Sequence, residues 1–291
     1  MEINKIYQMD CLDGLRQMSD KSVDLVVTSP PYDDLRDYKG FSFDFENIAR
    51  ELFRVLKDGG VIVWVVNDAT KNGSETGTSF RQALFFMNLG LNMHDTMIYE
   101  KNSMSMPDVV RYYNIFEYMF VFSKGKPKSI NLLADKKNRW AGSKSFGERS
   151  MRNKDGSLTN TGVGVVKEFG IRNNIWRYNT GFGYTTKDDY AFEHPAMFPE
   201  QLAKDHILSW SNEGDLVLDP FAGAGTTLKM AKQNNRKYIG FEISEDYVKI
   251  CLKRLQQNTL FDLMQPLDAK QEGGNGLPPT SKDVGIRPTI L

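Results

Sequence analysis

Continuous apolar runs of strand length alternate with amphipathic segments of helix length along most of the chain, and this alternation limits the fold more than any other feature of the sequence. The runs 23–28, 61–66 and 216–219 are apolar almost throughout, as strands buried on both faces of a parallel sheet require. Between them, segments such as 45–56 and 199–210 have the apolar spacing of helices. The alternation predicts an α/β fold with a doubly wound, mainly parallel sheet.

The rest of the chain as far as residue 258 continues this rhythm except in one region. Further strands are predicted over 4–10, 93–100, 116–122 and 237–242, and further helices over 11–18, 80–89, 226–234 and 244–258. The length of 291 residues suits one large domain with an insertion. No apolar run approaches the ~20 residues that span a bilayer, and the first residues lack a signal-peptide core, so we expect a cytoplasmic protein with no membrane partner.

The strand over 23–28 leads directly into a rigid turn, Ser29-Pro30-Pro31-Tyr32. Each proline fixes its own φ, and Pro31 also holds Pro30 in an extended conformation. The Ser29 hydroxyl and the Pro30 carbonyl could accept hydrogen bonds from the exocyclic amino group of a flipped nucleobase, and the Tyr32 ring offers a face for stacking. Taken alone, this turn would be interpreted as an ordinary loop after a strand.

A second strand, 216–219, is followed by a glycine-rich turn and the start of a helix, Pro220-Phe221-Ala222-Gly223-Ala224-Gly225-Thr226. Glycines let the backbone pass close to a ligand, and the first turn of the helix directs unpaired N–H groups into the same space. Glu242 ends the next strand, 19 residues after Gly223. This is close to the ~20-residue spacing at which an acid reaches ribose hydroxyls in dinucleotide folds.

Together these segments resemble the DNA amino-methyltransferases, whose motif is Ser, Asp or Asn followed by Pro-Pro and an aromatic residue. The glycine-rich turn resembles their S-adenosylmethionine (AdoMet) site. Because the Pro-Pro motif precedes the glycine-rich turn, the order resembles the β group of the family, a circular permutation of the usual fold. The resemblance covers residues 4–258 and implies a seven-stranded AdoMet-dependent methyltransferase sheet with an inserted DNA-recognition region.

The resemblance also implies roles for individual residues. Asp10 would contact the adenine of AdoMet, and Phe198 stands where many relatives have a lysine beside the cofactor. Tyr118 would flank the flipped base, although a plain strand aromatic is an equal alternative. The implied catalytic residues are Ser29, Pro30, Pro31 and Tyr32. The implied cofactor-binding residues are Asp10, Cys11, Phe198, Asp219, Pro220, Phe221, Gly223, Gly225, Thr226, Glu242 and Ile243.

Residues 124–190 interrupt the alternation and carry 14 Lys/Arg against 6 Asp/Glu, a net charge of +8 on a chain whose total is zero. Aromatic residues are interleaved with the basic ones. We predict that this segment orders on DNA and contacts phosphates, the alternative being a solvated lysine-rich loop. The predicted DNA-binding residues are Lys136, Lys137, Arg139, Lys144, Arg149, Arg152, Arg172 and Arg177.

The predicted organisation has four parts. They are a catalytic half (1–123), the target-recognition insertion (124–190), an AdoMet-binding half (191–260) and a disordered tail (261–291). Double-stranded DNA is the predicted partner. A cognate restriction endonuclease and a homodimer are the further partners considered.

The three histidines, His94, His194 and His206, lack metal-ligand spacing, so no metal site is predicted and each is expected at the surface or as a cap. Neither Cys11 nor Cys251 lies in a nucleophile context, which disfavours cytosine-C5 methylation. Within the family, a serine at the first motif position is more often found with cytosine-N4 acceptors. The favoured function is therefore cytosine-N4 methylation of DNA. The alternatives are adenine-N6 methylation, an RNA or protein amino-methyltransferase, and an inactive DNA-binding module.

Overall fold

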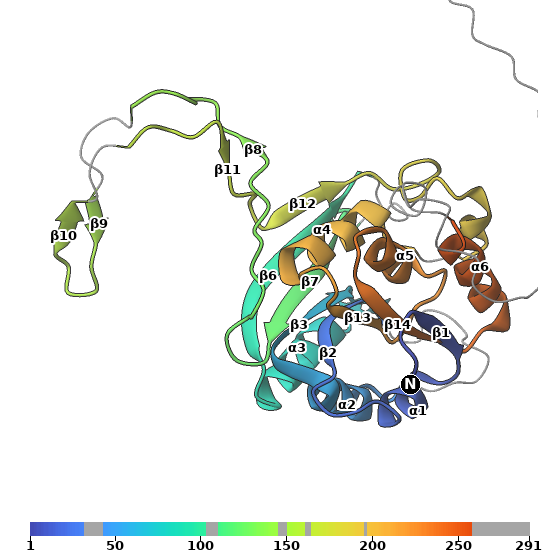
Figure 1. Ribbon diagram of the computed structural model, residues 1–291. Coiled ribbons are helices and arrows are strands. Elements are labelled where there is room, and N and C mark those ends of the chain that lie inside the picture. Colours follow the sequence, from blue (N-terminus) through green and yellow to red (C-terminus); the bar gives the residue numbers. More distant parts are fainter. Residues whose placement is uncertain (32–42, 103–109, 145–149, 161–163, 195–196, 258–291) are drawn as a thin grey trace, which may run out of the picture. The chain divides into compact units, whose positions relative to one another are not determined.

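The computed structural model describes residues 1–31, 43–102, 110–144, 150–160, 164–194 and 197–257. The predictions for Tyr32, Arg149 and the tail 261–291 therefore lie outside the described residues. Within this part of the chain, eight strands form one sheet in the order β1-β14-β13-β2-β3-β7-β6-β12 (Figure 1). Their bounds are β1 Lys5–Gln8, β2 Val23–Thr28, β3 Leu56–Val66, β6 Asn92–Lys101, β7 Phe116–Ser123, β12 Ile175–Tyr178, β13 Leu216–Asp219 and β14 Lys237–Glu242.

The sheet is mixed, with most neighbouring strands parallel. The pairs from β1 through β14, β13 and β2 to β3 are parallel, and so is β6 with β12. The pairs β3–β7 and β7–β6 are antiparallel. This confirms the predicted α/β class and its mainly parallel sheet.

The predicted number of seven strands is wrong, because β12 adds an eighth at one edge. This strand lies inside the segment 124–190, so the sheet continues into the region predicted as the insertion. Its side chains alternate: Trp176 and Tyr178 are buried, whereas Ile175 and Arg177 are exposed. Burial of the two aromatic rings against the sheet stabilises the edge pairing.

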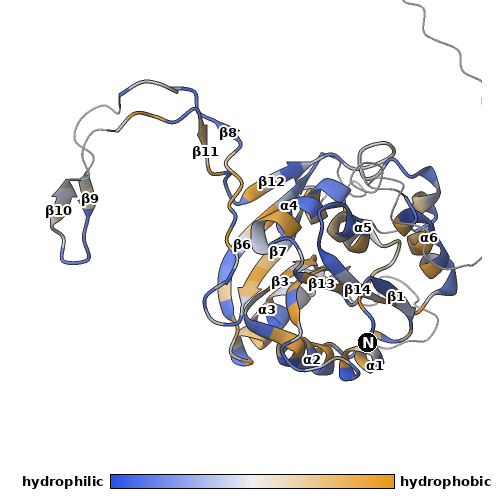
Figure 2. Ribbon diagram, viewed as in Figure 1, coloured by the Kyte–Doolittle hydropathy of each residue, from blue (hydrophilic) through white to orange (hydrophobic). Residues whose placement is uncertain are grey.

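Helices cover both faces of the sheet. Those on one face are α1 Cys11–Arg16, α2 Phe45–Val55 and α3 Thr78–Asn88, and those on the other are α4 Glu200–Trp210, α5 Thr226–Gln233 and α6 Glu245–Leu255. Alternate residues of the central strands feed two apolar cores, with Val26 and Trp64 on the first face and Val27 and Val63 on the second. Figure 2 shows the hydrophobic colouring of the central strands that results.

The remaining short elements lie between these helices and strands. They are β4 Thr70–Lys71, β5 Ser74–Glu75, β8 Lys136–Lys137, β9 Ser150–Arg152, β10 Leu158–Asn160, β11 Phe169–Gly170 and the 3-10 helix η1 Asp189–Glu193. β8 pairs with β11, and β9 pairs with β10, so segment 124–190 contains two small antiparallel ladders. No helix among the described residues is long and apolar enough to cross a membrane.

The expectation that all three histidines lie at the surface or cap a helix is wrong for His206. This residue is fully buried on α4, where its Nδ1 accepts a hydrogen bond from Trp210 Nε1 at 3.3 Å. Burial lowers the pKa of its imidazole to about 3, and the Arg172 guanidinium adds to that decrease. His206 is therefore a neutral core residue.

Candidate functional site

Two predicted turns come together where the strand order reverses. From β2 the chain passes through α2 to β3 on one side, and from β13 it passes through α5 to β14 on the other. Because β2 and β13 are parallel neighbours, their carboxyl ends lie at the same edge. Ser29, Pro30 and Pro31 follow β2 (the Pro-Pro turn), and residues 220–225 follow β13 (the glycine turn). A crevice at such a switch point is where open α/β sheets bind ligands.

Asp219, the last residue of β13, connects the ends of the two strands through its side chain. Its Oδ1 accepts hydrogen bonds from Thr28 Oγ1 at 2.6 Å and from Phe221 N at 3.1 Å. Both Thr28 and Asp219 are buried. Burial raises the pKa of the Asp219 carboxyl to about 6, although the hydrogen bond from Thr28 lowers it.

Asp219→Asn should therefore stabilise the ligand-free protein, and more so at high pH. The folded pKa of about 6 lies above the ordinary 3.8, so ionised Asp219 destabilises the fold above pH 6, and this penalty fades as the pH falls towards 4. The difference between these two pKa values corresponds to a loss in the free energy of unfolding of at most about 3 kcal/mol at pH 8 and roughly half of that at pH 5. Urea unfolding of both proteins at the two pH values measures the difference. An equal difference at pH 5 and pH 8 would contradict the buried-acid interpretation.

Glu242 ends β14, the neighbour of β13, and Asp10 follows β1, the next strand of the sheet. Glu242 Oε2 accepts from Gly223 N at 2.9 Å and Oε1 accepts from Ser244 N at 2.8 Å, so the acid shapes the glycine turn. Burial raises the pKa of the Glu242 carboxyl, and these two N–H groups offset part of the rise. Asp10 caps α1 by accepting from Leu12 N at 2.8 Å. With Asp219, three carboxyl groups thus lie at the ends of three successive strands of the sheet.

The glycine turn tolerates no side chain at two positions. Gly223 has φ +48°, and a Cβ there would lie 2.7 Å from His194 Nε2. Gly225 has φ +78°, and a Cβ there would lie 2.2 Å from Cys251 Sγ. Positive φ together with these contacts explains why both residues are glycine. The turn is thus packed against the segment before α4 and against α6.

The other predicted cofactor residues lie on several elements of the fold. Pro220 is buried, and Phe221 packs edge-on against Trp64 at a ring-centroid distance of 6.3 Å. Phe198 packs against the core on the α4 face, and Ile243 directly follows β14. Cys11 is buried at the start of α1, and burial raises the pKa of its thiol to about 12. The Cys251 thiol behaves in the same way.

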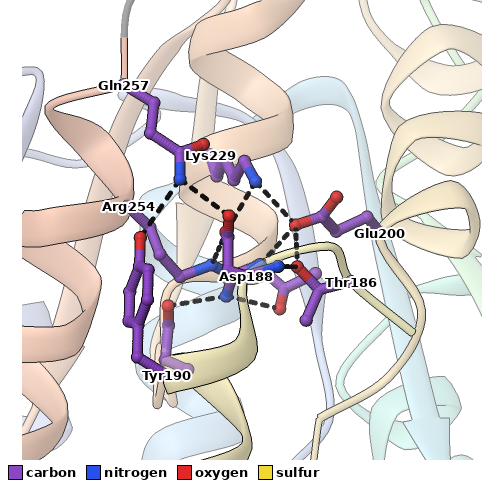
Figure 3. Close-up of polar contacts among 9 residues, drawn as sticks. Thr186, Asp188, Tyr190, Glu200, Lys229, Arg254 and Gln257 are labelled. Atoms are coloured by element: carbon purple, nitrogen blue, oxygen red, sulfur yellow. Dashed lines mark hydrogen bonds and ion pairs between the residues drawn. The ribbon is translucent and has the colours of Figure 1, made fainter. Parts of the chain in front are cut away.

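A buried cluster of charges, not predicted from the sequence, supports the glycine turn (Figure 3). Arg254 of α6 is fully buried and donates to Ala224 O at 2.7 Å and to Thr226 Oγ1 at 3.1 Å. It also pairs with Asp188 at 3.0 Å and with Glu200 at 2.6 Å. Lys229 of α5 pairs with the same two acids at 2.7 and 2.9 Å. Two acids and two bases thus balance each other beneath the turn.

The pKa directions in this cluster agree with its charge balance. Burial raises the pKa of the Asp188 carboxyl, but hydrogen bonds from Lys229, Gln257 and Arg254 outweigh it, so the pKa is lowered overall. Burial also raises the pKa of the Glu200 carboxyl, but hydrogen bonds from Lys229, Thr186 and Arg254 lower it overall. Both acids are therefore ionised at neutral pH, and the cluster joins the end of segment 124–190 to α4, α5 and α6.

The structure separates the predicted DNA-binding residues into two groups. Arg172 donates from Nη1 to Asp205 at 2.6 Å, pairs also with Asp135, and lies over the Trp176 ring at 4.9 Å. Its guanidinium anchors the segment to α4. Arg177 is exposed but pairs with Glu100. The residues that lie exposed along the two small ladders and their loops are Lys136, Lys137, Arg139, Lys144 and Arg152.

Tyr118 lies on β7 within an aromatic row. Its ring stacks on Phe120 at a centroid distance of 5.2 Å and contacts Phe80 and Phe116 edge-on. The residue is half-buried, and its partners Phe80 and Phe116 are not fully covered either. A role beside a flipped base stays a prediction.

Comparison with known proteins adds to this geometry. Residues 23–253 match the model of the N6/N4 DNA methylase family. The chain belongs to this family. The methylase is also 62% identical over 240 residues to the orphan methyltransferase M.BamHII of Bacillus amyloliquefaciens, a match that covers 82% of this chain and 91% of that protein.

Solved structures agree with the fold of the methylase. The PvuII DNA methyltransferase, which is cytosine-N4-specific, superposes with a TM-score of 0.63 at 20% identity, covering 87% of this chain and 86% of the other. A DNA modification methylase from Thermus thermophilus, solved in complex with S-adenosyl-L-methionine, gives a TM-score of 0.56 at 23% identity, covering 86% and 93% of the two chains. At this identity the likeness concerns the fold.

Proposed function

We propose that this methylase transfers a methyl group from AdoMet to the N4 amino group of cytosine in double-stranded DNA. The observation that carries the proposal is the placement of the Pro-Pro turn and the glycine turn at the ends of two neighbouring parallel strands. An acceptor held by the first turn would face a donor held by the second. Adenine-N6 transfer in the same site is the alternative.

The residues around the glycine turn fit AdoMet. Three carboxyl groups, from Asp10, Asp219 and Glu242, lie at the ends of successive strands and suit a ligand that carries a sulfonium charge, an amino group and ribose hydroxyls. When bound, AdoMet supplies an activated methyl group. Glu242 already accepts one backbone N–H at each oxygen, and the remaining lone pairs of its carboxylate can accept from the ribose.

Glu242→Ala should weaken AdoMet binding by about 1–3 kcal/mol, as expected when hydrogen bonds to a charged group are lost. The variant removes the ribose acceptor and also releases Gly223 N from its partner. Isothermal titration calorimetry measures the affinity. Glu245→Ala is the matched control, because this exposed glutamate in the first turn of α6 pairs only with Lys249 among its described ion-pair partners. Equal affinity of a folded Glu242→Ala protein would place the ribose elsewhere.

The Pro-Pro turn would act on the acceptor. An exocyclic amino nitrogen shares its lone pair with the base, and acceptors at Ser29 Oγ and Pro30 O would draw the nitrogen towards a tetrahedral shape. The lone pair would then attack the methyl carbon in line with its bond to the sulfonium sulfur. That bond would break as the new N–C bond forms, and the surplus amino proton would pass to solvent. The protein thus contributes positioning and electrostatic stabilisation. The high pKa of the two buried thiols provides no thiolate for covalent attack on a base.

The acceptor base must first leave the DNA stack, which costs a few kcal/mol. Stacking on an aromatic ring such as Tyr32 offsets part of this, at ~1–3 kcal/mol per contact. The choice of cytosine rests on the resemblance of Ser29-Pro30-Pro31 to the motif of cytosine-N4 enzymes. Adenine presents the same kind of amino group, so the turn itself accommodates both bases.

We also propose that segment 124–190 selects the DNA site. Its exposed basic residues, carried by two small ladders, suit contacts to phosphates, whereas Arg172 would hold the segment on α4. The cognate endonuclease and the homodimer stay predictions.

Raising the salt concentration should therefore weaken DNA binding steeply and AdoMet binding little. Each phosphate contact contributes about 0.9 to the slope of log K against log salt, so replacing Lys136 and Lys137 by alanine should reduce the slope by about 2. Fluorescence anisotropy with labelled duplexes measures this slope between roughly 50 and 200 mM salt. Lys249→Ala on α6 is the control. An unchanged slope in the double variant would remove these lysines from the DNA interface.

Transfer of tritiated methyl from AdoMet to duplex DNA, RNA and protein tests the proposed activity. We expect label in duplex DNA only. Label in RNA or protein would favour the corresponding amino-methyltransferase, and DNA binding without any transfer would favour an inactive DNA-binding module.

A further inference from the structure

The hydrogen-bonded ladder between β2 and β13 ends before the two turns of the site. Its Cα partners are Leu25 with Val217 and Val26 with Leu218, and the described ladder contains no later pair. On the other side, β2 stays paired with β3 as far as Thr28 with Trp64. At the switch point, then, no described backbone pair joins Val27 and Thr28 at the end of β2 to Asp219 at the end of β13.

Two side-chain hydroxyl groups connect the strands beyond the last backbone pair. Thr28 Oγ1, from the end of β2, donates to Asp219 Oδ1 at 2.6 Å. Thr227 Oγ1, from the start of α5, donates to Val27 O at 3.0 Å. Both bonds are buried, and they cross the switch point in opposite directions. Both bonds have one end in the strand that precedes the Pro-Pro turn. One reaches Asp219, just before the glycine turn, and the other reaches Thr227, just after it.

The hydrogen bond from Thr28 is the shorter of the two bonds that connect these turns. It directly precedes Ser29 in the chain, and its acceptor oxygen on Asp219 also takes the Phe221 N–H at 3.1 Å. A buried hydroxyl that donates to an acid is a strong hydrogen bond in a low-dielectric setting. A shift of Thr28 would therefore move the Pro-Pro turn relative to the glycine turn.

We propose that Thr28 is a positioning residue that fixes the Pro-Pro turn against the glycine turn, with Thr227 as its counterpart. The proposal rests on the proposed function, because it concerns the alignment of the acceptor amino group with the methyl donor. Alignment is a large part of the rate in a reaction without a covalent intermediate, and a displacement of about 1 Å can slow such a step ~100-fold. Binding of either ligand alone does not need this alignment.

The test compares Thr28→Val, which keeps the shape but loses the hydroxyl, with Thr28→Ser, which keeps the hydroxyl. Ser123→Ala is the control, because it removes a buried hydroxyl at the far end of β7, where Ser123 donates to Gly125 O at 2.8 Å. For Thr28→Val we expect kcat to fall about 10- to 100-fold while the calorimetric Kd for AdoMet and the Kd for DNA change less than about threefold. Thr28→Ser and Ser123→Ala should keep the wild-type kcat.

A second readout uses the ligand-free protein. The carboxyl carbon resonance of Asp219 should titrate at higher pH in Thr28→Val than in wild type, because the carboxylate loses a hydrogen-bond donor, and Thr28→Ser should restore the wild-type titration. If Thr28→Val does not fold, Thr227→Val replaces it, with the same expected drop in kcat at unchanged Kd.

Three outcomes would overturn the proposal, and they differ from one another. Wild-type kcat in a folded Thr28→Val protein would remove the positioning role alone. A fall in kcat matched by an equal fall in AdoMet affinity would make Thr28 a structural part of the cofactor site instead. A wild-type protein without any methyl transfer would overturn the proposed function, and this proposal with it.

Discussion

Ser29→Ala should slow methyl transfer about 30- to 1,000-fold while AdoMet and DNA still bind. The variant removes one of the two acceptors proposed for the amino group, and loss of one preorganised hydrogen-bonding group at a reacting centre is worth roughly 2–4 kcal/mol of transition-state stabilisation. The hydroxyl is not needed to hold either ligand. Single-turnover transfer of labelled methyl to duplex DNA measures the rate, and calorimetry measures cofactor affinity.

Ser19→Ala is the control for this variant, because Ser19 is an exposed serine between α1 and β2. It should transfer methyl groups at the wild-type rate. A Ser29→Ala protein with a wild-type rate would mean that the acceptor base is held by other groups. A variant that loses AdoMet binding as well would place Ser29 in the cofactor site.

Arg254→Met should lower the free energy of unfolding by about 3–5 kcal/mol, the loss expected when one partner of a buried ion pair is removed. Asp188 and Glu200 would keep only Lys229 as a cationic partner in the described cluster, and Ala224 O and Thr226 Oγ1 would lose their donor. Because two of these contacts support the glycine turn, AdoMet affinity should fall too. Urea unfolding and calorimetry measure the two effects.

Lys253→Met is the matched control, since it removes the neighbouring positive charge from the exposed side of α6. Lys253 lies 3.8 Å from the Tyr190 ring centre, and an exposed contact of this kind contributes about 1 kcal/mol or less. Adding Glu200→Gln to Arg254→Met restores the charge balance and should recover part of the lost stability. Equal losses in Arg254→Met and Lys253→Met would show that burial of the cluster does not determine its contribution.

Local sequence patterns predict the regular part of this fold well. Strands β2, β13 and β14 have the predicted bounds, because continuous apolar runs bounded by turn residues have few other solutions. Strand β3 begins at Leu56, earlier than predicted, since Gly59 and Gly60 exchange backbone hydrogen bonds with Lys124 rather than forming a separate turn. Here a long-range pairing overrides the local signal of two glycines.

Within segment 124–190, composition alone could not separate core from surface. Trp176 and Tyr178 belong to the aromatic residues that are interleaved with the basic ones, and both are buried on the edge strand β12. The basic residue Arg172 pairs with Asp205, 33 positions later in the chain. Positive charge and aromatic content are the same for a DNA-binding surface and for an anchored segment, so only the contacts distinguish them.

The candidate site likewise combines features that the sequence predicts with contacts that it does not. The two turns follow from motifs that are contiguous in the sequence, whereas the bonds that hold them join residues far apart, such as Thr28 with Asp219 and Arg254 with Asp188. No spacing rule links such pairs. A threonine before the Pro-Pro turn and a charged residue within a buried helix face are the only signals, and neither identifies its partner.

The most direct measurement for the proposed function is mass spectrometry of nucleosides from duplex DNA treated with the wild-type protein and methyl-labelled AdoMet. We expect labelled N4-methylcytosine from the wild-type protein. The same product should be absent with Ser29→Ala under single-turnover conditions that are too short for the slowed reaction. N6-methyladenine as the labelled product would contradict the choice of cytosine while keeping amino-group methylation. Labelled 5-methylcytosine, or no methylated nucleoside at all, would contradict the account of the site.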